Sequence, residues 1–264
     1  MLIDGGPNNK VLDCLGRYMP FYDREIDVVV LTHPQKDHMQ GLISVLGRYN
    51  VKYMVMGVEG NETLGYTQLV DIIRKKNIQV KNLYKGDRMA MVDVRMDVLW
   101  PTREYVVNNL TMKQCSNETM GQCNQLASAK GKVEQLQGGA VLGMTSDTDL
   151  NNFSFYMHLS YGSFDVLFTG DGDMKIQPSI ESLGAMPQVE VLKFPHHGSK
   201  TGMSAEFLDL LHPKLVVISV GKNSYGHPAR EALEILSERD IKILRTDKDG
   251  DVIVEADGTG WSVN

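Results

Sequence analysis

The sequence has few cysteines and no long apolar run. Its three cysteines are an odd number at spacings unlike a zinc knuckle, which argues against a disulfide framework and leaves Cys115 with Cys123 as the alternative to consider. No apolar run approaches the roughly 20 residues that a membrane span needs. The N-terminus opens on Met1 and Leu2 without a signal-peptide pattern. We therefore expect no membrane segment in this chain and a cytoplasmic location.

An excess of basic residues is also absent. The chain has 27 Lys and Arg against 33 Asp and Glu, a formal net charge of −6 at pH 7. This balance argues against a generally basic nucleic-acid surface, although a local patch around a metal could still bind phosphate groups. No internal repeat of solenoid length is visible. With 264 residues, 42% of them hydrophobic, the chain is long enough to bury a sizeable core.

The most informative segment is 32–38, which holds His33, Asp37 and His38 directly after the apolar run 26–31. That run has the composition of a buried strand, and the end of such a strand is the usual place for a site in an α/β sheet. Neutral imidazole nitrogen and carboxylate oxygen are ligands that zinc accepts. The pattern therefore indicates a metal site, with a solvated loop as the alternative.

Three further apolar runs end in loops of the same kind. These runs, 164–169, 189–194 and 215–220, lead to Asp171, to His196 and His197, and to His227. Each loop is rich in Gly or Pro, and the fourfold repetition strengthens the prediction of a metal site. Lys200 and Lys222 lie in two of these loops and are candidates to contact an anionic substrate; the alternative for each is a solvated surface charge.

Strand and helix patterns alternate along the chain. The first hundred residues predict strands at 26–31, 51–56 and 78–83, helices at 41–49 and 63–76, and a strand pair or one long strand at 89–99. The later residues predict a hairpin of 153–160 with 164–169, strands at 189–194 and 215–220, and helices at 175–183, 203–211 and 229–239. A final hairpin is predicted from 241–245 and 251–256 through the turn 248–250.

From about residue 102 to residue 151 the chain is polar, with helix potential only around 122–136. A connection this long inside a compact domain is usually functional or mobile, so we predict an insertion or lid over the site, with disorder as the alternative. The whole chain, residues 1–264, is expected to form a single domain. Its two halves, each a mixed sheet covered by helices, would bring their ligands together between the sheets of a four-layer αββα sandwich.

These motifs together resemble the metallo-β-lactamase superfamily. More narrowly, they are similar to the C-terminal domain of ComEC-type proteins, the bacterial DNA-uptake channel family, and its free-standing relatives. The resemblance rests on residues 2–7, 32–38, 169–171, 195–199 and 219–228, and it covers nearly the whole chain except the polar insertion.

The resemblance implies an α/β fold of the αββα type, one or two zinc or manganese ions, and hydrolysis of a phosphodiester in DNA or RNA. The residues that match the superfamily's ligand positions are His33, Asp37, His38 and Asp171, with Asp171 as the bridge between two metals, and the later histidines His196 and His227. Which of His196, His197 and His227 bind metal is left open by the sequence. Asp37 is expected to be a ligand or a general base.

Two residues depart from the superfamily's pattern. Gln35 stands where many members carry a second His, and Asn152 takes the place of another, again as in ComEC-like members. The first of these departures bears on the occupancy of one metal position. The chain also begins at the strand of residues 2–4, which leaves open whether an edge strand is missing.

A metal held by imidazoles and carboxylates lowers the pKa of its water from about 15.7 to near 7 and so supplies a nucleophile at neutral pH. With Asp37, His227 and Lys222 as the catalytic candidates, we predict a metal-dependent nuclease or phosphodiesterase acting on DNA or RNA. One alternative is hydrolysis of a small molecule, either a β-lactam or a phosphocholine-type ester. Another is a non-catalytic binding module in which Gln35 and Asn152 mark lost ligand positions.

Overall fold

In the computed structural model, which describes residues 1–110 and 148–264, the chain divides into two units. Unit 1 comprises Met1–Leu83 and Thr102–Phe153, and unit 2 comprises Tyr84–Pro101 and Ser154–Asn264. Most of the predicted lid, the helix predicted at 122–136 and the pair of Cys115 with Cys123 lie outside the described residues. The described ends of the lid segment form the helix α4 (Arg103–Asn109) and the short 3-10 helix η2 (Leu150–Phe153).

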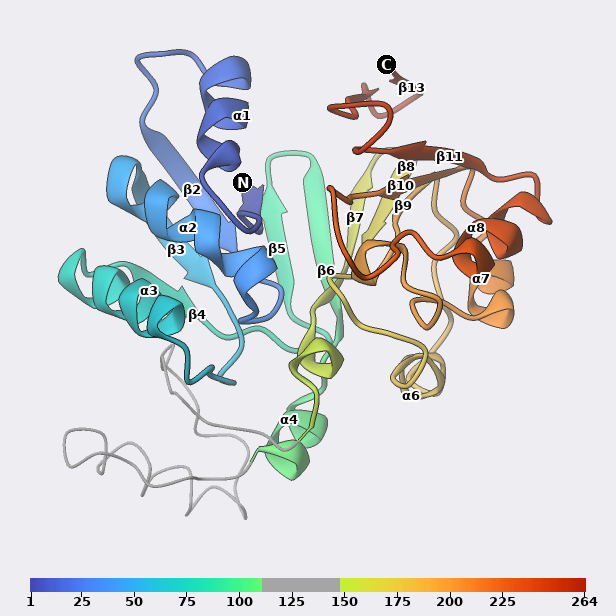
Figure 1. Cartoon of the computed structure of the whole chain (residues 1–264), viewed down its shortest axis with the longest axis horizontal. Coiled ribbons are helices and arrows are strands. Elements are labelled where there is room, and N and C mark those ends of the chain that lie inside the picture. The colour runs from blue at the N-terminus through green and yellow to red at the C-terminus, as the bar shows by residue number, and fades with distance from the viewer. Residues whose placement is uncertain (111–147) are drawn as a thin grey trace. The chain divides into compact units, whose positions relative to one another are not determined.

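Unit 1 is built on a parallel sheet with helices between successive strands (Figure 1). The strands, in sheet order, are β1 (Leu2–Ile3), β2 (Glu25–Val30), β3 (Asn50–Val55) and β4 (Gln79–Lys81). The helices are α1 (Lys10–Tyr18), α2 (Lys36–Arg48) and α3 (Leu64–Lys75). All three strand pairs of this sheet are parallel, so the prediction of a mixed sheet in this half is wrong. The cause is that a helix crosses from each strand to the next, which returns the chain to the same edge.

The core of unit 1 lies between this sheet and its helices. The helical spacing of Leu42, Val45 and Leu46 places them on one face of α2, and all three are buried against Val29 of β2 and its neighbours. The helix α1 was not predicted. It has no fully buried residue, and only partly buried side chains such as Leu12 and Leu15 pack against the core.

Unit 2 contains a seven-stranded sheet in which parallel and antiparallel pairs are mixed. In sheet order the strands are β11 (Lys242–Arg245), β10 (Leu215–Ile218), β9 (Val191–Lys193), β8 (Phe164–Phe168), β7 (Tyr156–Tyr161), β6 (Val94–Trp100) and β5 (Arg88–Met91). The strands β8 to β11 are parallel, and β5 to β8 are antiparallel neighbours. The strand pair at 89–99, the hairpin that leads to β8 and the α/β class are therefore confirmed.

The helices α6 (Gln177–Glu181), α7 (Ala205–Leu211) and α8 (Arg230–Ser237) connect the parallel strands of unit 2. The predicted pairing of 241–245 with 251–256 is wrong. Instead β12 (Val254–Ala256) pairs with β13 (Trp261–Val263), and β11 is the edge strand of the seven-stranded sheet. The apolar side chains of β12 and β13 pack on the cluster that contains Phe164, which places this hairpin on a face of the sheet. Within the residues that the structure describes, no helix has both the length and the apolar character of a membrane span.

Candidate functional site

The segment 32–38 forms a tight connection between β2 and α2 in unit 1. The helix α2 begins at Lys36, five residues before the predicted start at Gly41, so Asp37 and His38 lie in its first turn rather than in a loop. Gln35 is the N-cap, and its carbonyl oxygen accepts hydrogen bonds from the backbone N–H of His38 at 3.1 Å and of Met39 at 3.0 Å. Gln35, which stands where many metallo-β-lactamase superfamily proteins carry a His, is therefore the residue at which α2 begins.

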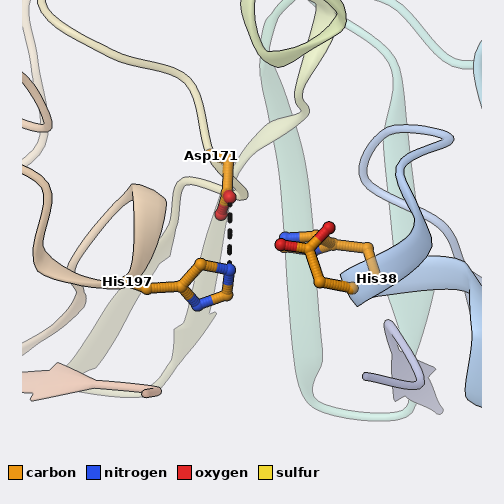
Figure 2. Close-up of side chains that lie close together, drawn as sticks. His38, Asp171 and His197 are labelled. Carbon is orange, nitrogen blue, oxygen red and sulfur yellow. Dashed lines mark ion pairs between the residues drawn. The ribbon is translucent and has the colours of Figure 1, made fainter. Parts of the chain in front are cut away.

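The imidazoles of His33 and His38 are both buried and both anchored through Nδ1. His38 Nδ1 lies 2.7 Å from Asp4 Oδ2, and a carboxylate can only accept, so Nδ1–H donates. The Thr32 hydroxyl already donates to Asp4 Oδ2 at 2.8 Å, so it accepts from His33 Nδ1 at 3.2 Å. In both rings the proton is on Nδ1 and the lone pair is on Nε2, the arrangement that outer-sphere partners give to metal-binding histidines. Figure 2 shows the His38 side chain.

Asp4 follows β1 and joins these contacts. Its backbone is left-handed, with φ of 57°, and its Oδ1 accepts from the Thr32 N–H at 2.8 Å. Burial alone would raise the pKa of this carboxyl, but the charge and hydrogen bond of His38 together with the Thr32 N–H lower it, so Asp4 is ionised near neutral pH. The structure therefore places Asp4 in direct contact with a candidate metal-binding histidine.

We predict that Asp4→Asn weakens metal binding by about 10- to 100-fold, the usual effect of losing an outer partner of a ligating histidine. The amide can still accept from the Thr32 N–H, but it replaces the charged acceptor of His38. Competition with a chromogenic chelator measures the change. The control is Asp27→Asn, which alters an exposed carboxylate of β2 paired with Lys52; equal metal affinities in both variants would contradict the role of Asp4.

In unit 2, Asp171 lies in the turn that follows β8. Its side chain is buried, with 1% of the residue exposed. The backbone N–H of Asp171 donates to Ser154 Oγ at 3.1 Å, and the Thr169 hydroxyl donates to the carbonyl oxygen of Lys193 at 2.8 Å. These bonds fix the turn between β8 and its parallel neighbour β9, so the carboxylate has a defined position at the end of the sheet.

Asp171 and His197 face each other, as Figure 2 shows. The distance from His197 Nε2 to Asp171 Oδ2 is 3.3 Å. On the other side of the ring, Nδ1 lies 2.7 Å from the carbonyl oxygen of Ser219, which can only accept, so Nδ1 carries a proton. His197 therefore donates from Nδ1, as His33 and His38 do, and directs Nε2 toward Asp171.

The backbone around His197 is strained. His196, His197 and Gly198 are consecutive left-handed residues, with φ of 49°, 52° and 86°. Left-handed backbone costs a non-glycine residue roughly 1–2 kcal/mol and tends to occur at functional sites. At Gly198 a Cβ would lie 2.5 Å from Cβ of Pro228, so this position needs glycine for space as well as for its φ.

His196 and His227 face each other instead of Asp171, with ring centroids 5.7 Å apart. Their Nδ1 atoms are buried and have no hydrogen-bond partner among the described residues. Burial, followed by the nearby His196 and His197, lowers the pKa of His227, so its ring is neutral at pH 7, the form that binds metal. Of the three histidines left open by the sequence, the structure brings His197 against Asp171 and pairs the rings of His196 and His227. The Asp171 charge also reaches His227, where it opposes the fall in pKa.

Lys193 is a residue that the sequence analysis did not single out. It is the last residue of β9, and its Nζ donates to the carbonyl oxygen of Gly170 at 2.9 Å and lies 3.6 Å from Asp171 Oδ1. The sequence feature that could have identified Lys193 is its position as a lone lysine in an apolar strand shortly before two histidines. The two lysines that were singled out, Lys200 and Lys222, are both exposed in loops of unit 2.

Glu59 of unit 1 was also missed. It is 1% exposed, and neither carboxyl oxygen has a hydrogen-bond partner in the described part of the chain. Burial raises its pKa to about 8, so this carboxyl is largely protonated at neutral pH. Glu59 follows β3 and lies between Val58 and Gly60. These neighbours form no motif, so nothing in the sequence pointed to this carboxyl group.

The donor atoms fit a divalent metal within each unit. In unit 1 Asp37 and His38 offer ligand atoms within 4.8 Å of each other, and in unit 2 Asp171 and His197 do so. Imidazole nitrogen with carboxylate oxygen is a set that zinc and manganese accept. Asn152, buried in η2, offers an amide instead of an imidazole.

A scan against models of protein families finds no match. Among solved structures, the metallo-beta-lactamase fold protein YhfI from Bacillus subtilis is similar, with 12% identity, a TM-score of 0.46, and coverage of 93% of this chain and 83% of that one.

Two curated relatives match in sequence. ComE operon protein 3 of Bacillus subtilis strain 168 is 23% identical over 230 residues, which are 87% of this chain and 24% of the relative. Competence protein ComA of Neisseria gonorrhoeae is 36% identical over 104 residues, 39% of this chain and 15% of the relative. The chain thus spans a quarter or less of the length of these proteins. These two sequence matches bear out the predicted resemblance to ComEC-type competence proteins.

Proposed function

We propose that the chain is a metal-dependent hydrolase that cleaves phosphodiester bonds in DNA or RNA. The proposed ligands are His33, Asp37 and His38 in unit 1, and Asp171 and His197 in unit 2. The observation that carries the proposal is a bond that three histidines share: His33, His38 and His197 each donate from Nδ1, which directs Nε2 away from that bond. Outer partners of this kind fix which nitrogen of a histidine is offered to a metal.

A divalent metal held there supplies a Lewis acid and lowers the pKa of a coordinated water to near 7. The residues of the chain position the ligands, orient water and stabilise negative charge. Asp4 and the Ser219 carbonyl hold His38 and His197 in place, and Asp37 binds metal or orients water. Lys193 places a positive charge beside the Asp171 carboxylate, where it favours an approaching phosphoryl oxygen.

Nucleic acid is favoured as the substrate by the resemblance of the motifs to the ComEC DNA-uptake family, the similarity to a competence protein, and the exposed lysines of unit 2. Lys200 and Lys222 lie in the loops after β9 and β10, next to the candidate histidines in sequence. Because the chain has a net charge of −6, such local cations are needed to attract a polyanion.

The test is cleavage of single- and double-stranded DNA and RNA by the purified chain loaded with zinc or manganese. We expect cleavage that stops with a chelator, returns with added metal, and is lost in His33→Ala. Metal content near one or two ions per chain accompanies it. Cleavage that persists in His33→Ala and in chelator would contradict the proposal.

The alternatives give different results in the same experiments. Turnover of a chromogenic β-lactam or a phosphocholine ester with inert oligonucleotides would favour a small-molecule hydrolase, because the same metal chemistry attacks carbonyl and phosphoryl centres. Less than one metal per chain after reconstitution would favour the non-catalytic binding module.

A further inference from the structure

Tyr225 is exposed on a loop of unit 2 that also carries the candidate residues Lys222 and His227. The residue is 82% exposed, although an aromatic ring is costly to leave in water. It lies between β10 and α8, in a stretch of the loop whose residues from Gly221 to Gly226 are all exposed. A single exposed aromatic residue is common on protein surfaces, but the loop around Tyr225 holds this ring in an unusual way.

The loop that carries Tyr225 is fixed by one side chain. Asn223 Oδ1 accepts from the backbone N–H of Tyr225 at 3.1 Å and of His227 at 3.0 Å. Asn223 Nδ2 donates to the carbonyl oxygens of Gly221 at 2.9 Å and of His227 at 2.8 Å. Four hydrogen bonds from one residue order the backbone on both sides of Tyr225, so the ring is presented from a defined position.

One face of the Tyr225 ring lies against the ring of His227. It stacks on His227 with centroids 6.1 Å apart and an angle of 23° between the rings, and His227 in turn contacts His196. The loops that carry these rings are joined by the hydrogen bond from Ala229 N–H to the Gly198 carbonyl oxygen at 2.8 Å. Tyr225 thus ends a row of rings that begins beside the candidate metal ligands of unit 2.

We infer that Tyr225 is the platform on which an unpaired base of a single-stranded nucleic acid stacks, with Lys222 and Lys200 beside its phosphates. This inference rests on the proposed function and narrows its substrate class. Proteins that bind single strands combine an exposed aromatic face with nearby cations in this way, because every base has a π face and every nucleotide a charge. A paired base in a duplex has no free face to offer, so the site selects unpaired strands or frayed ends.

The test uses an oligodeoxynucleotide carrying 2-aminopurine, whose fluorescence falls when the base stacks, in chelator so that no cleavage occurs. The wild-type chain and Tyr225→Phe are expected to bind and quench. Tyr225→Ala is expected to lose the quenching and to bind about 5- to 150-fold more weakly, the range for one lost base–aromatic stack. Tyr22→Ala is the control, because it removes a tyrosine of unit 1 that is 75% exposed. Equal binding and quenching by Tyr225→Ala and wild type would overturn the inference, as would no binding by the wild type.

A second measurement separates this inference from the proposed function. With metal present, Tyr225→Ala is expected to raise KM more for a normal oligonucleotide than for an abasic one, whereas Tyr225→Phe is expected to match the wild type on both. If the wild type cleaves both equally well, the hydrolase stands and the platform is refuted. If no nucleic acid is cleaved but Tyr225-dependent quenching is seen, the platform stands and the hydrolase is refuted.

Discussion

Asp171→Asn is expected to lower metal-dependent hydrolysis and metal affinity by more than about 100-fold, beyond the usual effect of losing an outer partner. The substitution keeps the size of the side chain but removes the charge that faces His197 Nε2 at 3.3 Å and Lys193 Nζ at 3.6 Å. An amide oxygen is a weaker metal ligand than a carboxylate. No second carboxylate among the described residues of unit 2 pairs with His197, so the loss of metal affinity and of hydrolysis should be nearly complete.

Metal analysis, steady-state rates with an oligonucleotide and near-UV circular dichroism check this result together. The matched control is Asp173→Asn, two residues further on, where a carboxylate that is also buried accepts from the Lys175 N–H at 3.0 Å. That bond survives in the amide, so the control should keep metal and activity. A folded Asp171→Asn protein with wild-type metal content would show that this carboxylate is no ligand.

Gly41→Ala is expected to destabilise unit 1 by about 3 kcal/mol or more, although alanine is the better helix former. A Cβ at Gly41 would lie 2.0 Å from the carbonyl oxygen of Gly5 and 2.6 Å from that of Asn8. These are backbone atoms, and the Gly41 N–H donates to the Gly6 carbonyl oxygen at 2.9 Å, so the segment after Asp4 must move away from α2. Metal affinity should fall as well, because that segment positions Asp4 beside His38.

Urea unfolding measures the free energy change, and Gly47→Ala is the matched control. Gly47 lies in the same helix and has nothing within 4 Å of its Cβ position, so alanine there should stabilise the chain by roughly 0.5–1 kcal/mol. The two Gly→Ala substitutions in α2 are therefore expected to change the free energy of unfolding in opposite directions. If both variants were stabilised, the close approach of Gly5 to α2 would be wrong.

Buried strands were the elements most readily predicted from the sequence. The runs that became β3, β8 and β10 are mainly apolar, and each is followed closely by Gly, a pattern that favours a strand. Pairing was harder, because a turn such as 248–250 indicates a reversal without saying which strand is the partner. The packing of Trp261 and Val254 against the sheet decides the pairing of β12, and no local pattern contains that information.

The candidate ligands were predictable as residues but their arrangement was not. His and Asp after a strand suggest chemistry, yet the sequence could not show that α2 begins at Lys36 or that His197 rather than His196 faces Asp171. That choice depends on the left-handed backbone of His196 and His197. Lys193 was overlooked because its apolar neighbours identify it first as part of a strand. The prediction that the ligands of both units hold a common ion stays a prediction.

The bonds from Nδ1 of His33, His38 and His197 have a consequence for the thermodynamics of ion capture. None of these rings can turn over without breaking its bond to Thr32, Asp4 or the Ser219 carbonyl. Their rotational freedom is therefore lost when the chain folds and not when the ion arrives. Capture then carries a small entropic penalty, and each ring offers the same nitrogen to every ion that enters.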